Sequence, residues 1–277
     1  MPFVAVIGNL VKDVVDGALP RPGGAVFYQA RAFHRIAPQT DVHLVTRCAA
    51  ADRELLVPPL EEFGLPLTWR PARETQAFSF HYEGEHRIME VDALGDPWTT
   101  DDVEGWVAQA IGDAPWVMVG ALTRADFAPG TLSALRAHGR QLLIDGQGFV
   151  RRGTLGSLVR DSHVPPEAFA SVRGLKLSES EARVLAGSTE PADLRRLCVP
   201  EVVITRGSHG TLVVTAETAE QIPAIPIDEP VDPTGAGDTF WVAYLVARSN
   251  GALPVEAAHT ASETTAAILT STSRPGG

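Results

Sequence analysis

The sequence has little of several features that mark whole classes of protein. Its two cysteines, Cys48 and Cys198, form neither the count nor the spacing of a disulfide framework or a zinc site. The longest apolar runs, such as Phe3–Ile7 and Trp116–Val119, have strand length and are far shorter than a membrane span. No basic start followed by a long apolar stretch marks a signal peptide. We therefore expect a cytoplasmic protein with reduced thiols and no membrane association.

Positive charge is also scarce. The chain carries 23 Lys+Arg against 34 Asp+Glu, a formal net charge of −11, and only two lysines, Lys12 and Lys176. Because a phosphate backbone attracts a basic surface, this balance argues against a nucleic-acid or anionic-membrane partner. With 277 residues, of which 44% are hydrophobic, the chain can bury a sizeable core, and we predict a single domain over residues 1–277.

Three common catalytic motifs are missing as well. The sequence holds no Gly-x-x-x-x-Gly-Lys-Ser/Thr loop, no Gly-x-Ser-x-Gly elbow and no His-Glu-x-x-His pair. A P-loop nucleotidase, an α/β-hydrolase and a zinc protease of that type are therefore excluded.

What the sequence does contain is an alternation of short apolar runs and amphipathic stretches. The runs predict buried parallel strands at Phe3–Ile7, Val42–Thr46, Trp116–Val119, Gln141–Ile144, Val172–Leu177 and Val202–Thr205. The stretches between and after them predict helices at Val26–Ile36, Thr100–Ile111, Pro129–His138, Ser178–Ala186, Ala236–Asn250 and Pro254–Thr270. This order predicts an α/β protein of three layers with a mostly parallel central sheet.

One segment, about residues 67–91, departs from this order. Its residues alternate, with Phe78, Phe80 and Tyr82 on one face and a turn near Glu83-Gly84-Glu85, which predicts an inserted β-hairpin acting as a lid. The core, a substrate or a second subunit must cover the apolar face. His81 and His86 flank the turn and could hold a metal, although a solvated lid tip is the interpretation we favour.

The most informative stretch is Asp232-Pro233-Thr234-Gly235-Ala236-Gly237-Asp238-Thr239-Phe240. It is predicted to join a strand around Ile225–Ile227 to a long helix that starts near Ala236. Closely spaced glycines let the backbone approach a ligand, and unpaired N–H groups at a helix start favour an anion such as phosphate. Asp238, in the first turn, could take a proton from a hydroxyl that attacks that phosphate. An acid that only complements the helix dipole, beside a plain tight turn, is the alternative.

This stretch resembles the C-terminal signature of the ribokinase family, the phosphofructokinase B-type carbohydrate kinases. Three other segments are similar to family segments that contact substrate or nucleotide: Gly8–Asp13, the pair Gly23-Gly24 and Thr205–Gly210. The ending Thr272–Gly276 resembles the family's final active-site loop. The resemblance spans nearly the whole chain and implies a ribokinase-like fold with a small β lid, through which a homodimer could form.

The resemblance also implies roles for particular residues. Asp238 would be the catalytic base, and the amides of Gly235, Ala236 and Gly237 would form the anion hole for a phosphoryl group transferred from ATP. Glu181 would act on Mg²⁺ through water, and Asp232 and Thr234 lie where related kinases bind a monovalent cation such as K⁺. The nucleotide would be bound by Lys176, Thr205, Gly207, Ser208 and Gly210.

The acceptor is expected to contact Asp13, Gly23, Gly24, Tyr28, Gln147 and Arg151. The run Asp145–Arg151 is similar to a subset of the family that includes inositol and nucleoside kinases. Tyr28 lies near the place where many sugar kinases carry an Asn, and its ring offers an apolar face to a cyclitol or a base. Only Arg151 and Lys12 are cationic candidates nearby. These features favour a neutral polyol, inositol or a nucleoside, over a sugar phosphate.

The pattern departs from the family at the Asn-x-x-Glu motif, where Ser178 replaces the Asn. Two other functions stay open: a catalytically silent regulatory protein that binds the same ligands, and a vitamin kinase of the pyridoxal type. The intact Gly235–Asp238 run favours an active kinase over the first, and the pair Gly23-Gly24 favours a sugar-type kinase over the second.

Overall fold

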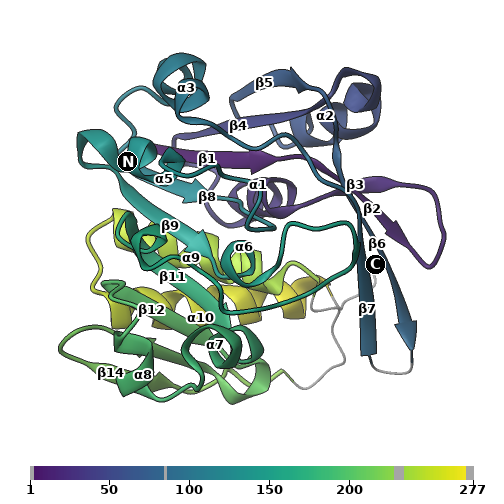
Figure 1. Ribbon diagram of the computed structural model, residues 1–277. Helices are drawn as coiled ribbons and strands as arrows, with labels where there is room; N and C mark the ends of the chain where they lie inside the picture. Colours follow the sequence, from purple (N-terminus) through teal and green to yellow (C-terminus); the bar gives the residue numbers. More distant parts are fainter. Residues whose placement is uncertain (1–2, 84–85, 228–233, 273–277) are drawn as a thin grey trace.

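The computed structural model describes residues 3–83, 86–227 and 234–272 and contains two β-sheets (Figure 1). The large sheet has nine strands in the order β14-β13-β12-β11-β9-β8-β1-β4-β5. These strands are β1 (Val4–Asn9), β4 (Val42–Ala49), β5 (Leu67–Ala72), β8 (Trp116–Val119), β9 (Gln141–Asp145), β11 (Val172–Ser178), β12 (Glu201–Thr205), β13 (Thr211–Val214) and β14 (Ala219–Ile222). Only β13 and β14 pair antiparallel to their neighbours, so the sheet is mostly parallel, as predicted.

Alternate side chains of the central strand β1 enter two different cores. Val4 and Val6 of β1 belong to one hydrophobic cluster, whereas Ala5 and Ile7 belong to another on the opposite face. Because side chains alternate along a strand, a sheet that is apolar on both faces must be covered by helices on both. The three-layer α/β architecture is therefore confirmed.

The helices divide between the two faces accordingly. The first core is covered by α1 (Ala25–Ile36), α2 (Arg53–Glu61), α9 (Ala236–Ser249) and α10 (Pro254–Thr272). The second is covered by the helical segment Val103–Val107 and by α4 (Ala108–Ile111), α5 (Thr131–Arg136), α7 (Glu179–Ala186) and α8 (Pro191–Arg195). The helix predicted over Thr100–Ile111 is interrupted by a wider turn at Val103–Val107, where Gly105 leaves helical geometry. The four residues of α6 (Gln147–Val150) follow β9 directly.

The small sheet has five strands in the order β10-β7-β6-β2-β3. They are β2 (Val11–Val15), β3 (Arg21–Gly23), β6 (Gln76–Glu83), β7 (His86–Ala93) and β10 (Gly156–Ser157). The predicted lid hairpin is thus β6–β7, which extends to one side of the large sheet in Figure 1. The other three strands were not predicted, because segments of two to five residues show too little alternation to be recognised.

Two boundaries of the prediction are wrong. Leu67–Ala72 is not part of the lid, since it forms β5 and pairs in parallel with β4 at the edge of the large sheet. Residues 225–227 do not form a strand, because the last strand ends at Ile222. Among the helices of the described residues, none combines the length and the apolar composition that crossing a membrane requires.

Candidate active site

A cavity of about 350 Å³ lies between the small sheet and the carboxyl-terminal edge of the large sheet. This edge is where open α/β sheets bind ligands, because loops diverge there. The cavity is lined by Asp13, Val15, Arg21, Gly24, Ala25, Tyr28, Phe78, Phe80, Met89, Leu122, Gln147, Arg151, Thr234, Gly235 and Asp238. Five of the six residues expected to contact an acceptor therefore meet the expected base, Asp238, around one cavity.

The sixth, Gly23, lies behind the cavity and supports Asp13. It pairs with Val11 on β2, and a Cβ placed on Gly23 would lie 2.1 Å from Oδ2 of Asp13. The Asp13 carboxylate, itself buried, thus occupies the space that any side chain at Gly23 would need. Glycine at this position is what lets the carboxylate reach the cavity.

We expect Gly23→Ala to raise the KM for the acceptor about tenfold, because the added methyl group displaces the Asp13 carboxylate. The KM for the phosphoryl donor should change little. A double variant with Asp13→Ala is the control: if Gly23→Ala acts through Asp13, it adds almost nothing to the effect of Asp13→Ala. Additive effects in this cycle would contradict the assignment.

The lid closes the cavity with apolar side chains. Phe78 and Phe80 of β6 line it and are 3% and 6% exposed, and Met89 of β7 lies beside them. On the outward side of the same hairpin, the hydroxyl of Ser79 donates to Asp92 at 2.9 Å. Phe78 and Phe80, two residues of the predicted apolar face, are therefore covered by their own chain.

The charges at this cavity differ from the prediction. Lys12 does not reach it, because alternation along β2 turns its side chain away from the side of Asp13, and its ammonium pairs with Asp52 at 3.0 Å. Arg21, which was not singled out, does line the cavity, and it lies opposite Asp13 in the β2–β3 register. Together with Arg151 and Asp238, the cavity thus holds two basic and two acidic side chains.

The glycine-rich turn forms the start of α9. Gly235 is the residue before the first helical turn and has φ of 80°, a left-handed conformation that favours glycine. A Cβ on Gly235 would also lie 2.6 Å from Nη2 of Arg31. The carbonyl of Gly235 accepts the N–H of Thr239, so the amides of Ala236, Gly237 and Asp238 stay without a partner within the helix. This is the geometry that binds an anion.

Asp238 lies in that first turn, next to these amides. Burial raises the pKa of its carboxyl group to about 7, and Lys176 opposes this rise while Asp145 adds to it. Nε2 of Gln29, a fully buried side chain of α1, donates to Oδ1 of Asp238 at 3.5 Å. A carboxylate with a pKa near neutrality is suited to accept a proton from a hydroxyl.

Lys176 lies beneath the same helix start. It is buried in β11 and forms an ion pair with Asp145 at the end of β9. Its Nζ would lie 3.2 Å from a Cβ on Gly237, so the ammonium lies beside the expected anion hole. Burial alone would lower the pKa of Lys176, but Asp145, Asp238 and Glu181 raise it, so the group stays charged.

Glu181 and Ser178 cap α7. The Glu181 carboxylate accepts the N–H of Ser178 at 2.8 Å, and the Ser178 hydroxyl accepts the N–H of Glu181 at 3.3 Å. Nowhere in residues 3–83, 86–227 and 234–272 do three or more His, Cys, Asp or Glu side chains gather in a way that could hold a metal ion. The second Glu181 oxygen nevertheless suits Mg²⁺ that arrives with phosphates, since that ion keeps several waters and takes few carboxylates.

The residues expected to bind nucleotide continue from Lys176 along the same edge. Ser178 pairs with Thr205 in the β11–β12 register, and Gly207–His209 forms a short turn after it. Gly210 has φ of 84°, and a Cβ there would lie 2.0 Å from the carbonyl oxygen of Ile222. The turn thus packs on residues 222–224, which lead into a shallow cavity of about 550 Å³ between Ile225, Pro226 and α10.

The proposed monovalent-cation position is not supported. The carbonyl oxygen of Thr234 accepts a hydrogen bond from Nη2 of Arg31 at 3.3 Å, so this oxygen faces a guanidinium group. Asp232 and the end of the chain after Thr272 lie outside the described residues.

Three residues at the site escaped the sequence analysis: Gln29, Arg21 and Arg31. Gln29 carries the clearest signal, because it is a polar residue on the buried side of α1 among Val26, Ala30 and Phe33. The guanidinium of Arg31 lies over the Tyr28 ring, 4.9 Å from its centroid. Nothing in the local sequence marks Arg21 or Arg31, because their position depends on segments far away in the chain.

Comparison with known proteins relates the chain to a family of kinases. Residues 158–274, less than half of the chain, match the model of the pfkB family carbohydrate kinases, and this segment contains Lys176, Glu181 and the start of α9. Two curated proteins are similar to it: a cytidine kinase of Thermococcus kodakarensis, 40% identical over 80 residues, and a ribokinase of Arabidopsis thaliana, 35% identical over 101 residues. These alignments cover 27% and 33% of this chain, and only 28% and 27% of the relatives' lengths.

Solved structures share the fold of this chain over its full length. A pyrophosphate-dependent kinase in the ribokinase family, complexed with a pyrophosphate analog and myo-inositol, superposes with a TM-score of 0.76 at 20% identity, covering 100% of this chain and 96% of the other. The ribokinase of Thermotoga maritima superposes with a TM-score of 0.72 at 19% identity, covering 100% and 94%. The predicted ribokinase-like fold is therefore confirmed.

Proposed function

We propose that this protein is a kinase that transfers the γ-phosphoryl group of ATP to a hydroxyl group of a small neutral polyol. One observation carries the proposal: Gly235 and Asp238, at the start of α9, line one cavity with Asp13, Gln147 and Arg151. An acceptor bound in this cavity would therefore have its hydroxyl group close to both the base and the anion site that stabilises the transferred phosphoryl group.

In this mechanism the acceptor lies under the lid, with its hydroxyl group toward Asp238. The Asp238 carboxylate takes the proton as the hydroxyl oxygen attacks the γ-phosphorus atom of ATP. The bond from this phosphorus to the β,γ-bridging oxygen breaks, and ADP leaves. The amides of Gly235, Ala236 and Gly237 and the ammonium of Lys176 stabilise the negative charge on the phosphoryl oxygens. Glu181 would hold a water of the Mg²⁺ ion that arrives with the donor, and this ion would supply neutralisation of the phosphate charge.

The rest of the donor would extend from Lys176 past Thr205 to the turn at Gly207, Ser208 and Gly210. This turn packs on the segment that leads to the cavity beside α10, whose apolar lining of Ile225, Pro226 and Ala266 suits the face of a nucleobase. The proposal therefore includes a nucleoside triphosphate as donor. It does not include K⁺, because the Thr234 carbonyl faces Arg31.

A neutral acceptor fits the charges of the cavity. Arg21 and Arg151 are offset by Asp13 and Asp238, so no surplus of positive charge remains for a phosphate on the acceptor. The ring of Tyr28 gives an apolar surface, on which the C–H face of a cyclitol or the base of a nucleoside can lie. The homodimer through the lid stays a prediction, which sedimentation velocity at micromolar concentration can test. Phe78 and Phe80 of the hairpin are already buried within one chain, so they do not require a second subunit to cover them.

The test is a coupled assay of ADP release with Mg²⁺-ATP and a panel of inositols, pentoses, hexoses, nucleosides and fructose 6-phosphate. We expect kcat/KM to be highest for a neutral acceptor. A sugar phosphate that is about tenfold better than every neutral acceptor would show that the charge balance was misjudged. ATP binding without ADP release from any acceptor would instead favour the silent regulatory protein.

A further inference from the structure

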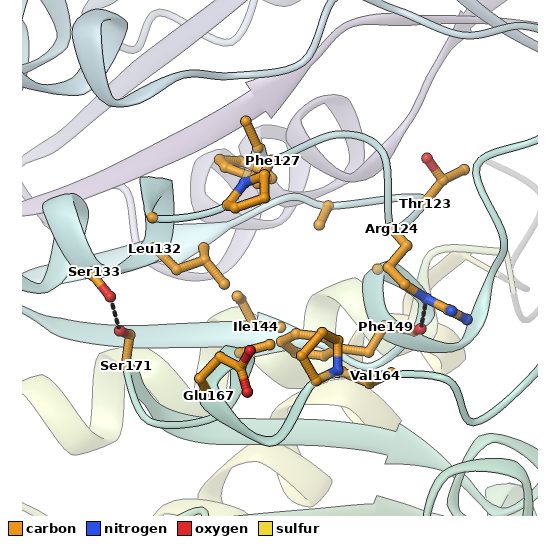
Figure 2. Close-up of a pocket in the computed structure, with 17 residues that line it drawn as sticks. Thr123, Arg124, Phe127, Leu132, Ser133, Ile144, Phe149, Val164, Glu167 and Ser171 are labelled. Atoms are coloured by element: carbon orange, nitrogen blue, oxygen red, sulfur yellow. Dashed lines mark hydrogen bonds between the residues drawn. The ribbon is translucent and has the colours of Figure 1, made fainter.

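A second cavity, which we call the α5–α6 cavity, lies on the other side of α6 from the acceptor. It measures about 550 Å³, more than the acceptor cavity, and its floor is Ile144 of β9 (Figure 2). Its walls are the loop 121–130, α5, α6 and residues 164–171. None of its lining residues has a part in the proposed phosphoryl transfer.

The α5–α6 cavity is built between fixed walls. At one end the guanidinium of Arg124 donates to the carbonyl oxygens of Phe149 at 2.8 Å and His163 at 2.7 Å, and it pairs with Asp161 at 2.5 Å. At the opposite end the hydroxyls of Ser133 and Ser171 are hydrogen bonded at 3.1 Å, as Figure 2 shows. These bonds join α5 and α6 to the segment 161–171, so the space between them is preformed.

The residues that line the cavity indicate the shape and the charge of a ligand that would fit it. Phe127 lies on one side of Ile144 and Phe149 on the other, so a flat ring can lie between two aromatic side chains (Figure 2). Most of the surface is apolar, which is typical of small-molecule sites of this volume. The guanidinium of Arg124 is already bonded to Asp161 and to backbone carbonyl oxygens of the cavity wall. Glu167 also lines the cavity, and its carboxylate forms no ion pair with the described residues. Such a site favours a positively charged or N–H-donating group.

Helix α6 and the neighbouring loop form the wall between the two cavities. Gln147 lines the acceptor cavity, while Gly148 and Phe149, the next residues of α6, line the α5–α6 cavity. On the neighbouring loop Leu122 lines the first and Ala121 the second. A Cβ on Gly148 would lie 2.3 Å from the Cβ of Ala121, so α6 packs on this loop without free space. A ligand that displaces Phe149 must therefore also move Gln147.

We propose that the α5–α6 cavity is an effector site for a flat aromatic amine and that its occupation changes the affinity for the acceptor through α6. The first half of this proposal, that the ligand binds in the cavity, does not depend on the proposed kinase function. The second, regulatory half, that binding changes the affinity for the acceptor, rests on that function. Because a ligand can change acceptor affinity only by a difference in interaction between two arrangements of α6, the coupling should be modest, about threefold to tenfold.

The test uses two probes of similar shape and opposite charge, tryptamine and indole-3-propionate, titrated calorimetrically into the full chain. We expect tryptamine to bind with a Kd of about 100 μM and at least about tenfold more tightly than the acid. Glu167→Gln should remove this preference, and Ala168→Phe, which fills the cavity, should abolish binding. Equal binding of both probes, binding of neither at about 1 mM, or unchanged binding to Ala168→Phe would overturn the site.

The regulatory half is measured with the acceptor found in the kinase assay. Tryptamine should change the KM for the acceptor about threefold or more and leave the KM for ATP almost unchanged, and Ala168→Phe should not respond. Tryptamine binding without an effect on the acceptor would overturn the coupling. Absence of any kinase activity would instead refute the proposed function, while the calorimetric result on the site would stand.

Discussion

Asp238→Asn should lower kcat by about a hundredfold or more while the affinity for ATP stays nearly unchanged, because it removes a positioned base and keeps the shape of the side chain. In the unaltered protein, kcat/KM should rise with pH through about 7, the pKa of Asp238, and this rise should be absent from the variant. Full turnover of Asp238→Asn would refute its assignment as the base.

The same variant separates loss of catalysis from loss of folding. Since burial raises the pKa of Asp238 to about 7, the folded state holds a proton that the unfolded chain releases near pH 4. The stability contributed by the protonated form is complete below that pH and is lost as the pH rises through 7. Relative to the unaltered protein, Asp238→Asn should thus gain about 4 kcal/mol in free energy of unfolding at pH 8 and nothing at pH 4.

A matched control distinguishes a base from an acid that only complements a helix dipole. Glu256 lies in the first turn of α10, where its carboxylate accepts the N–H of Leu253 at 2.8 Å. Glu256→Gln should change stability by about 1 kcal/mol at most and leave kcat within about twofold. Equal losses of activity in both variants would mean that Asp238 acts through the structure alone.

Lys176→Met should lower kcat/KM for the donor by about a hundredfold, because it removes the positive charge that lies beside Gly237. The KM for the acceptor should change little, since Lys176 does not line the acceptor cavity. Lys176→Arg should retain part of the activity if charge is what matters. Steady-state kinetics with each substrate varied in turn measure this difference.

Two further variants guard the interpretation. Lys176→Met leaves the buried Asp145 carboxylate without its ion-pair partner, which can lower the free energy of unfolding by about 3–5 kcal/mol. Adding Asp145→Asn removes the unpaired charge and with it this loss of stability. The double variant should regain stability but not donor kcat/KM. Lys12→Met, which removes the other lysine and its pair with Asp52, should leave the kinetics unchanged. Recovery of donor kcat/KM in the double variant would contradict a role of Lys176 toward phosphate.

The large sheet could be predicted because its determinants are local. Runs such as Trp116–Val119 are apolar at every position, and only a strand covered on both faces buries all of them, so prediction and structure agree there. Leu67–Ala72 alternates in the same way as the hairpin that follows it. Periodicity gives the orientation of side chains within a strand but not its partner, and so β5 was assigned to the wrong sheet.

By itself, the sequence determined the start of α9, since two glycines around one alanine and an acid in the first turn define an anion site through backbone geometry that needs no distant residue. Only the tertiary structure decided what faces that site. Gln29 and Lys176 lie 209 and 62 positions before Asp238 in the chain. A hydrogen bond between Gln29 of α1 and Asp238 of α9 joins the two helices. Arg21, and not Lys12, lines the acceptor cavity together with Arg151, because the direction of a side chain depends on which face of a short strand the rest of the chain covers. Such contacts depend on the packing of two sheets and two helix starts, whose distances are not encoded in any local pattern.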